Sequence, residues 1–465
     1  MNAPAVPHQS ELLTGPDLRV GAALAGTAMA TALLLACGIL SGLIAARSLG
    51  PAGRGELAAI TVWAAVLVFA GAFGLPEAVA YFSAADRASR DRVWTTGQLG
   101  AVVLGLAVAV IGWWAIPAAF HGDDAALAEA IRLYLIFYAV PCLGFACAAS
   151  WLQGTGLSHP FNVSRSSVHV VSAVGMVMLA LGGSHSVAYF AGATLAGTAT
   201  AWCLSAAYGP FTRLVVARPS IALAKRMLRY GIRVQVGNWS SAASLRLDQL
   251  LLSLFAAPAT LGLYVVAVSY ANVLLTIPAS AAMVMLPQIV ERHSAGGARE
   301  CLQRWYRRML WTTVLGAIAI GLLGTIIVPF AFGSAFQDAV PLLVVLMPAA
   351  LMLGMNDILS TAFLGIGRPD ITSKGELVGL VVTVAALFAL LPRYGVLGAA
   401  LASLLAYSSI HVYLMRQAVV VIGSDLKSLC VPTHDDLDAL RRVSVHAQQR
   451  LARAAFKRAM RTHEL

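Results

Sequence analysis

The segment from Val20 to Ala46 reads VGAALAGTAMATALLLACGILSGLIAA, and none of its 27 residues is charged. A helix needs about 20 apolar residues to cross the hydrocarbon core of a bilayer, with all its backbone polar groups bonded internally. The whole chain has a similar character, since 59% of its 465 residues are hydrophobic and 11% are charged. Soluble domains carry about 25% charged residues. We therefore expect an all-α integral membrane protein.

About twelve apolar stretches of this length follow one another along the chain. They cover residues 20–46, 57–84, 95–118, 130–152, 166–181, 187–207, 230–256, 261–290, 309–331, 339–366, 371–391 and 395–421. Only Gly182–Ser186 separates the fifth stretch from the sixth. The pattern predicts a disordered cytoplasmic N-terminus (1–19), a six-helix lobe (20–208), a basic cytoplasmic linker (209–229), a second six-helix lobe (230–422) and a basic cytoplasmic tail (423–465).

The positive charges fall mainly on one side of this predicted topology. With a cytoplasmic N-terminus, 27 of the 32 Lys and Arg residues lie in cytoplasmic segments, whereas Arg47, Arg54, Arg132 and Arg393 lie outside and Arg246 lies within a span. Cytoplasmic loops of membrane proteins are enriched in Lys and Arg. The net charge of +11 therefore reflects topology and not nucleic-acid binding, and both termini are predicted to be cytoplasmic, in a bacterial plasma (inner) membrane.

Six cysteines are scattered without the spacing of a disulfide framework or a metal site, so no cofactor and no metal are expected.

The two halves of the chain share an internal repeat. RSLGPAGRGE at Arg47–Glu56 aligns with FAAPATLGLY at Phe255–Tyr264 at an offset of 207. The alignment pairs Pro51 with Pro258 and Gly55 with Gly262. LPE at Leu75–Glu77 matches LPQ at Leu286–Gln288, and GTG at Gly154–Gly156 matches GIG at Gly365–Gly367, both at an offset of 211.

Gly and Pro are also the commonest turn residues, so independent punctuation of two unrelated halves is the alternative to a duplication. Because each half would hold six spans, the copies would enter the membrane from the same side. Such parallel repeats are typical of transporters, whose site lies between the repeats.

The same residues resemble a known family. RSLGPAGRGE, the GLPE of Gly74–Glu77 and the RLDQ of Arg246–Gln249, followed by Pro258 and Gly262, are similar to the oligosaccharide flippases. These form the polysaccharide-transporter branch of the multidrug, oligosaccharidyl-lipid and polysaccharide exporter superfamily. The resemblance implies a MATE-like fold with two six-helix lobes around a cavity that opens alternately to either face. It also implies a polyprenyl-pyrophosphate-linked oligosaccharide as cargo.

Ionisable side chains at membrane depth are costly and therefore mark candidate functional sites. In the seventh stretch Asp248 shares one helical stripe with Ser241 and Ser244. Arg246 lies about 160° away on the same helix. The stripe is predicted to face a substrate cavity, but polar bonding between helices is an alternative. The substrate-binding candidates are Arg246, Asp248, Ser241, Ser244, Asn238, Gln249, Arg47 and Arg54.

Arg47 and Arg54 flank a glycine-rich turn on the predicted outer side. Guanidinium groups bind phosphate oxygens in pairs, so these two suit a lipid pyrophosphate. Solvated surface anchors are the alternative.

For ion coupling, the candidates are Asp357, Asn356, Thr361 and Glu77. Asp357 and Thr361 are one helical turn apart, which would suit a proton or sodium ion, or else a capped helix break.

The tail carries seven charges between Arg441 and Arg461, all positive, and apolar residues at helical spacing. This pattern predicts an amphipathic helix on anionic cytoplasmic lipids, with docking of a partner as the alternative. A polysaccharide polymerase or glycosyltransferase would be such a partner.

Direct ATP drive is disfavoured because no P-loop motif is present. Transport is favoured over a membrane-embedded polysaccharide enzyme or a scaffold, and a cation-coupled drug or metabolite antiporter is the alternative transporter.

Overall fold

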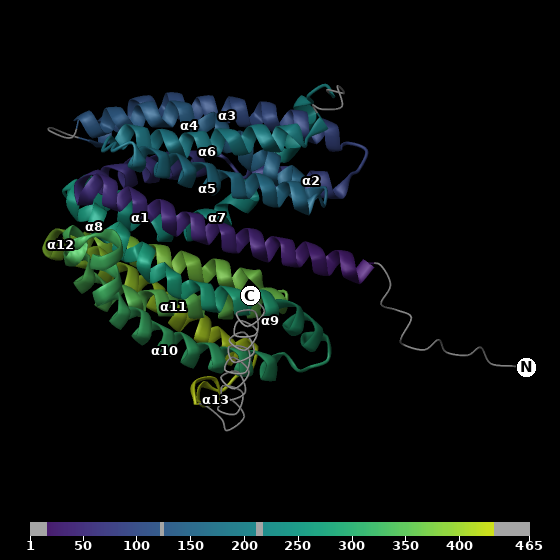
Figure 1. Ribbon diagram of the computed structural model, residues 1–465. Helices are drawn as coiled ribbons and strands as arrows, with labels where there is room; N and C mark the ends of the chain where they lie inside the picture. The colour runs from purple at the N-terminus through teal and green to yellow at the C-terminus, as the bar shows by residue number, and fades with distance from the viewer. Residues whose placement is uncertain (1–15, 121–124, 211–216, 432–465) are drawn as a thin grey trace, which may run out of the picture. The chain divides into compact units, whose positions relative to one another are not determined.

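The computed structural model describes residues 16–120, 125–210 and 217–431, and every regular element in these ranges is helical (Figure 1). The predicted tail helix lies outside these residues. The elements are α1 (Pro16–Gly71), α2 (Leu75–Ala85), α3 (Arg90–Ala119), α4 (Ala125–Gly154), α5 (Ser158–Leu181), α6 (Val187–Ala207), α7 (Ile221–Phe255), α8 (Pro258–Ala271), η3 (Asn272–Leu275), α9 (Thr276–Ser294), α10 (Ala298–Phe332), η4 (Ser334–Ala339), α11 (Val340–Gly365), α12 (Pro369–Val421) and α13 (Leu426–Cys430).

Two of these helices are twice as long as a membrane span, and each is interrupted by a glycine. The 56 residues of α1 contain Gly50, with φ 68° and ψ −176°, and the 53 residues of α12 contain Gly395, with φ 54° and ψ −131°. Residues with a Cβ rarely adopt such a backbone. Pro51 then starts the second helix of α1, because proline favours the first helical turn. Each glycine separates two predicted spans.

Nine segments of the described chain are long and apolar enough to cross a membrane. Two of them are the interrupted helices, which hold two predicted spans each. The predicted seventh span corresponds to α7, which is not among the nine and carries Arg246 and Asp248. All twelve predicted apolar stretches are therefore helical, except that a turn at residues 72–74 divides the second between α1 and α2. The chain is an all-helical membrane protein.

Several helices begin earlier than the hydropathy of the sequence predicts, and the largest difference is at α10, which begins at Ala298 and was expected from Met309. The fifth span was expected from Ser166, but α5 begins at Ser158, so that Arg165 lies within the helix. The seventh was expected from Tyr230, but α7 begins at Ile221, where the Ser220 hydroxyl accepts a hydrogen bond from the Leu223 amide. Polar or charged residues soon after a helix start hide it from a hydropathy average, whereas a capping serine marks one.

The described residues fall into two compact units, which are treated separately below. The first unit comprises residues 1–270, 323–346 and 379–403, and the second comprises residues 271–322, 347–378 and 404–465. These boundaries cut through α10, α11 and α12. The division into two six-helix lobes remains a prediction.

In the first unit, α3 packs along α4, and α5 packs along both α6 and α1 (Figure 1). Its core is rich in small residues and large aromatic ones, with Trp94 on α3 meeting Trp151 on α4 edge to face at 5.0 Å. Small residues allow helices to approach closely in lipid, where burial of apolar surface gives no advantage.

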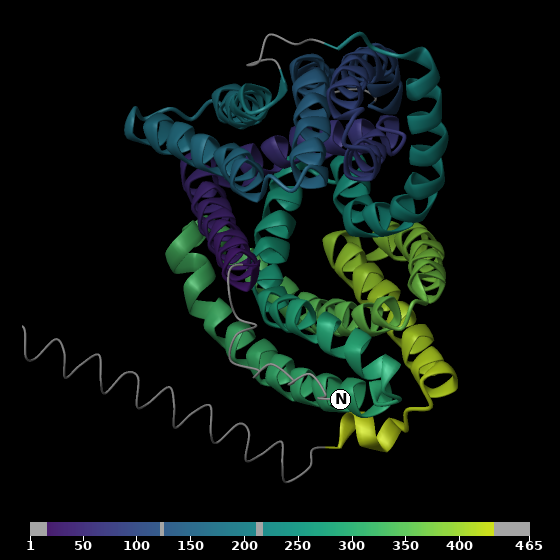
Figure 2. The ribbon, with the colours of Figure 1, turned by 90° about the vertical axis from the view of Figure 1, so that its right-hand side faces the viewer.

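In the second unit, α13 is fastened to α10, and Figure 2 shows the short yellow helix beside the green one. Arg307 donates to the Ser428 carbonyl at 2.7 Å, and the Trp311 indole donates to the Cys430 carbonyl at 3.0 Å. Both carbonyls lie near the end of α13, where backbone acceptors lack partners within the helix. The last described segment is thus held by side chains of α10.

The repeated motifs adopt the same local structure in both copies. Pro51 begins a helix and Pro258 begins α8. Further along, Gly156 and Gly367 follow the ends of α4 and α11 with φ of 81° and 75°. In each case the amide of the next residue bonds to the carbonyl five positions back, at 2.9 Å for Leu157 and 2.8 Å for Arg368. This is the same glycine-dependent helix stop. The shared geometry favours a duplication.

Candidate functional site

The helix α7 carries most of the predicted substrate-binding residues. The side chains of Asn238, Ser241 and Ser244 lie outside the described residues. Arg246 has an exposed side chain and Gln249 a half-buried one. The predicted polar stripe is therefore described only at Asp248, which is 4% exposed.

Asp248 is enclosed by hydrogen bonds from three directions. The Tyr264 hydroxyl, on α8, donates to Oδ2 at 2.5 Å, and the Ser403 hydroxyl, on α12, donates to the same oxygen at 3.3 Å. The Gln249 amide donates to Oδ1 at 2.7 Å. A buried carboxylate needs such donors, because desolvation is otherwise prohibitive. In this conformation Asp248 joins α7, α8 and α12 and leaves little capacity for a cation.

Arg246, two residues earlier, lies on another side of α7. It is near enough to Tyr138 of α4 and to Asp248 for their charges to interact. Tyr138 in turn stacks on Tyr134 at 5.2 Å. Arg246 therefore presents an exposed guanidinium, a group suited to an anionic ligand.

In the second unit, Asn356 belongs to a chain of hydrogen bonds. Its amide donates to the Tyr407 carbonyl at 3.0 Å, and its Oδ1 lies 2.9 Å from Nδ1 of His411. The other ring nitrogen of His411 lies 2.9 Å from the Tyr306 hydroxyl. Asn356 is 3% exposed and its amide group is fully engaged. These hydrogen bonds indicate that Asn356 joins α11 to α12, and through His411 to α10.

Asp357 has different surroundings from its neighbour Asn356. Glu376 of α12 lies near enough for the two carboxylates to repel each other. Thr361 is half-buried one turn further along α11. Asp357 is exposed and Glu376 is half-buried, and two acidic groups that repel each other can share one proton or bind one cation. The structure thus separates Asp357 from Asn356, although the two are adjacent in sequence.

Glu77, the fourth ion-coupling candidate, lies in the first turn of α2. Its carboxylate is near enough to the Cys147 thiol of α4 for an electrostatic interaction. The equivalent residue of the repeat, Gln288, accepts a hydrogen bond from the Trp305 indole at 3.0 Å. The repeat position thus holds a polar group that contacts a neighbouring helix.

The two arginines that flank the glycine-rich turn have different surroundings. Arg47 donates through Nε to the Ala331 carbonyl at 2.6 Å and through a terminal nitrogen to the Phe330 carbonyl at 2.5 Å. These carbonyls close the C-terminus of α10, where a positive charge is favourable. Arg54 has a buried Nε without a hydrogen-bond partner among the described residues. Of the two, Arg54 has the greater free capacity for an anion.

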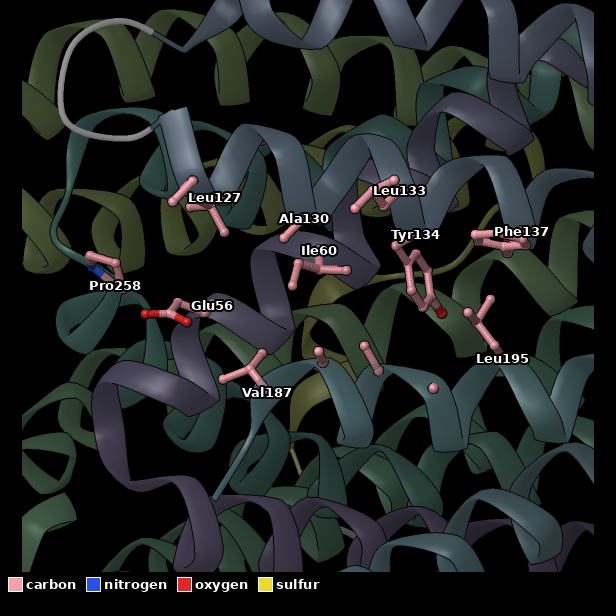
Figure 3. Close-up of a pocket in the computed structure, with 14 residues that line it drawn as sticks. Glu56, Ile60, Leu127, Ala130, Leu133, Tyr134, Phe137, Val187, Leu195 and Pro258 are labelled. Carbon is pink, nitrogen blue, oxygen red and sulfur yellow. The ribbon is translucent and has the colours of Figure 1, made fainter. Parts of the chain in front are cut away.

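A cavity of about 460 Å³ lies between the second half of α1 and helices α4, α6 and α8. Figure 3 shows Glu56 and Pro258 at one end, with Tyr134 and Phe137 toward the other. Most of the remaining lining is aliphatic. The Tyr134 hydroxyl lies 2.9 Å from the hydroxyl of Thr194. The cavity therefore offers an apolar wall with one carboxylate at its end.

Some residues of these networks were not predicted from sequence. Tyr264 and Ser403 hold Asp248, His411 binds Asn356, and Glu376 interacts electrostatically with Asp357. Tyr264 was part of the quoted repeat but carried no assigned role. His411 and Glu376 are ionisable residues within α12 and were detectable by the same rule that selected Asp357.

No group of three metal-ligating side chains occurs within residues 16–120, 125–210 and 217–431.

A family model described as "Polysaccharide biosynthesis protein" matches residues 25–293. A 189-residue segment is 25% identical to the uncharacterized membrane protein MJ1068 of Methanocaldococcus jannaschii, covering 40% of this chain. It spans 37% of that relative's length.

Solved structures show a similar fold. The Lipid II flippase MurJ, in an inward closed conformation, has a TM-score of 0.71 at 13% identity, over 87% of this chain and 88% of that one. An inward-facing multidrug resistance MATE family transporter of the MOP superfamily has a TM-score of 0.69 at 16% identity, over 84% and 95% of the two chains. The family match covers more than half of this chain. The chain belongs to the polysaccharide biosynthesis protein family, and it has the MATE/MurJ-like fold of MOP-superfamily transporters.

Proposed function

We propose that this protein is a flippase that moves a polyprenyl-pyrophosphate-linked oligosaccharide, a precursor of cell-surface polysaccharide, from the cytoplasmic to the outer leaflet. Family membership supports a role in polysaccharide biosynthesis. The fold supports transport by alternating access, since it is shared with proteins titled as a lipid flippase and a multidrug transporter. In this proposal the protein acts as a carrier without catalytic residues.

The observation that carries the choice of cargo is the state of three charged side chains in the first unit, Asp248, Arg246 and Arg54. Asp248 accepts hydrogen bonds from Tyr264, Ser403 and the Gln249 amide, so its charge is already compensated. Arg246 is exposed, and the buried Nε of Arg54 lacks a hydrogen-bond partner among the described residues. An exposed guanidinium and a second one with spare hydrogen-bonding capacity favour an anionic cargo over the organic cations of a drug antiporter.

We further propose that Asp357 and Glu376 couple transport to a proton or a sodium ion. The repulsion between the two carboxylates supports this role, because binding one cation would relieve it. Asp357 corresponds by the repeat offset to Ala146, so the acidic pair is a feature of one half of the chain. A site in one half alone suits coupling better than a symmetric scaffold.

The proposed location is the plasma (inner) membrane of a bacterium, with both termini in the cytoplasm. The asymmetry of Lys and Arg supports this orientation. The tail beyond Val431 is proposed to bind anionic lipids, and a polysaccharide polymerase or glycosyltransferase is proposed as a partner. Vesicles containing phosphatidylglycerol should bind the full chain more strongly than a chain truncated after Val431. Equal binding would contradict the lipid role of the tail.

The test is a depletion strain in which the sidedness of the lipid-linked oligosaccharide is measured with a membrane-impermeant glycan probe. Depletion should trap the intermediate in the cytoplasmic leaflet, and the wild-type gene should restore its exposure. Arg246→Ala and Asp357→Asn should each fail to restore it. Matched controls are Arg393→Ala and Asp338→Asn, because both side chains are exposed and lie outside the proposed sites.

Unchanged sidedness on depletion would overturn the flippase proposal. Full complementation by Arg246→Ala and Asp357→Asn would retain the function and overturn these two site assignments. The alternative, a cation-coupled drug or metabolite antiporter, predicts instead that depletion raises sensitivity to cationic drugs and leaves the lipid intermediate unchanged.

A further inference from the structure

A second cavity, of about 720 Å³, lies in the first unit between the beginning of α1 and α5. Its α1 side is apolar and includes Met29 and Leu33, which are 74% and 45% exposed. Its α5 side is polar, with one amide, one imidazole and three hydroxyls from Asn162, His159, Ser158, Ser166 and Ser167. The two sides together form an amphipathic cavity.

The polar side is built on a hydrogen-bonded seam between the two helices. Asn162 donates to the hydroxyl of Thr27 at 3.1 Å, and Arg165 donates to the hydroxyl of Thr31 at 2.8 Å. The Thr31 hydroxyl donates onward to the Thr27 carbonyl at 2.9 Å. This chain fixes Asn162 in the cavity wall and holds the Arg165 guanidinium beside it.

Two polar atoms of this seam have unused bonding capacity. Asn162 is only 9% exposed, and its buried Oδ1 has no hydrogen-bond partner among the described residues. The Nε of Arg165 is in the same state. Buried polar atoms are nearly always bonded in native proteins, so the unpaired Oδ1 of Asn162, which lines the cavity, is available to a ligand there. The amide offers an acceptor and the guanidinium a donor.

The charge of the seam limits the kind of ligand. None of the described residues that line the cavity is acidic, and the ion pairs found in the described parts of the chain do not include Arg165. A partly buried positive charge without a carboxylate partner attracts an anion. Hydroxyls and an amide beside it suit a hydroxylated group. The chemistry is that of a sugar phosphate.

We propose that this α1–α5 cavity binds the phosphorylated, hydroxylated head of the transported molecule, or a soluble sugar phosphate of the same chemistry. Asn162 and the serines would bind the hydroxyls, while Arg165 supplies the charge that retains the phosphate. A lipid chain would lie along Met29 and Leu33. The inference rests on the proposed flippase function and extends it by naming a site on the side of the membrane where α1 and α5 begin.

Binding to the purified full-length protein in lipid nanodiscs provides the test. The probes are polyprenyl monophosphate, glucose 1-phosphate and phosphatidylcholine, titrated separately. Arg165→Gln should weaken binding of the phosphate probe about tenfold, the usual effect of losing a charge-assisted bond. Arg165→Lys keeps the charge and should remain within about threefold of wild type. The matched control is Arg87→Gln, which removes an exposed positive charge from the α2–α3 connection and should leave affinity unchanged.

A space-filling variant tests the cavity itself. A Cβ placed on Gly26 meets no atom within 4 Å, so Gly26→Leu should fill the cavity without disturbing the helix. It should reduce binding of the phosphate probe as strongly as Arg165→Gln does. A matching glycine outside the cavity is Gly38, which also has open space around it. Gly38→Leu should bind like wild type, and thermal unfolding should confirm that all variants are folded.

Preferential binding of polyprenyl monophosphate would support a lipid ligand, whereas preferential binding of glucose 1-phosphate would support a soluble one. Equal binding of phosphatidylcholine, or unchanged affinity in both Arg165→Gln and Gly26→Leu, would overturn the site. The depletion assay separates this result from the broader proposal. Altered sidedness with unchanged binding in the variants rejects the site and keeps the flippase, whereas unchanged sidedness with impaired binding rejects the flippase and keeps the site.

Discussion

Gly55 of α1 and Gly262 of α8 face each other at van der Waals distance. A Cβ on Gly55 would lie 2.9 Å from the amide nitrogen of Gly262, and a Cβ on Gly262 would lie 3.1 Å from that of Gly55. Each glycine also packs on the proline of the other copy, because the added carbon would lie 1.7 Å from the Pro258 carbonyl oxygen or 2.0 Å from that of Pro51. The two repeat motifs therefore contact each other reciprocally, and neither position has room for a side chain.

The first prediction concerns this contact. Gly55→Ala and Gly262→Ala should each lower the free energy of unfolding by about 1–3 kcal/mol, because backbone atoms must move apart to admit a methyl group. Gly42→Ala is the control, since a Cβ there meets no atom within 4 Å. It should be neutral or slightly stabilising, as alanine favours the helix. Thermal unfolding of the purified proteins measures the difference, and equal melting temperatures for all three variants would contradict the observed packing.

The second prediction concerns the bond between Asp248 and Tyr264. Tyr264→Phe removes the hydroxyl that lies 2.5 Å from the carboxylate and should destabilise the first unit by about 1–3 kcal/mol. Ser403→Ala removes a longer bond of 3.3 Å and should cost less. A double-mutant cycle with Asp248→Asn isolates the coupling between the two side chains. Additive losses for Tyr264→Phe and Asp248→Asn would show that the contact contributes nothing to stability.

The third prediction separates two adjacent residues of α11. Asn356→Leu should destabilise the protein by about 1–3 kcal/mol, because it removes the bond to the Tyr407 carbonyl and leaves Nδ1 of His411 without the Asn356 oxygen. Asp357→Asn should leave the melting temperature near that of wild type and abolish ion-dependent transport. The measurements are thermal unfolding and the sidedness assay at varied proton and sodium gradients. A large stability loss in Asp357→Asn would assign that residue a structural role.

The fourth prediction concerns Arg47. Its guanidinium bonds to the Phe330 and Ala331 carbonyls, so Arg47→Ala should destabilise the C-terminus of α10 by about 0.5–2 kcal/mol. Hydrogen exchange should rise selectively at that end of the helix. If Arg47 instead receives pyrophosphate, the variant would lose transport while the exchange pattern stayed unchanged.

Much of the fold follows from the sequence because lipid imposes a simple rule. Every backbone polar group must be bonded within its own segment, so the apolar stretches had to be helices wherever they were long enough. The turns followed from glycine and proline, as Gly50, Pro51 and Gly395 show. The helix starts at Ser158 and Ile221 were hidden because polar or charged residues soon after each start, such as His159 in α5 and Lys225 and Arg226 in α7, lower the hydropathy average.

The pairing of polar groups could not be predicted in the same way. Helical periodicity placed Asp248 on a stripe expected to face a cavity, and only the packing of α8 and α12 showed that Tyr264 and Ser403 enclose it. Asn356 and Asp357 carried one joint prediction, although their side chains leave α11 in different directions and meet His411 and Glu376 respectively.

The sequence by itself determined that this protein is embedded in lipid, where its helices lie and where its proposed internal repeat falls. Hydropathy and backbone preference act over a few residues at a time and can be read locally. Only the tertiary structure decided that Gly55 meets Gly262, that Asp248 is closed off and that Asn162, in the seam with Arg165, lines a cavity. Those contacts join residues far apart along the chain, and their geometry depends on how whole helices pack.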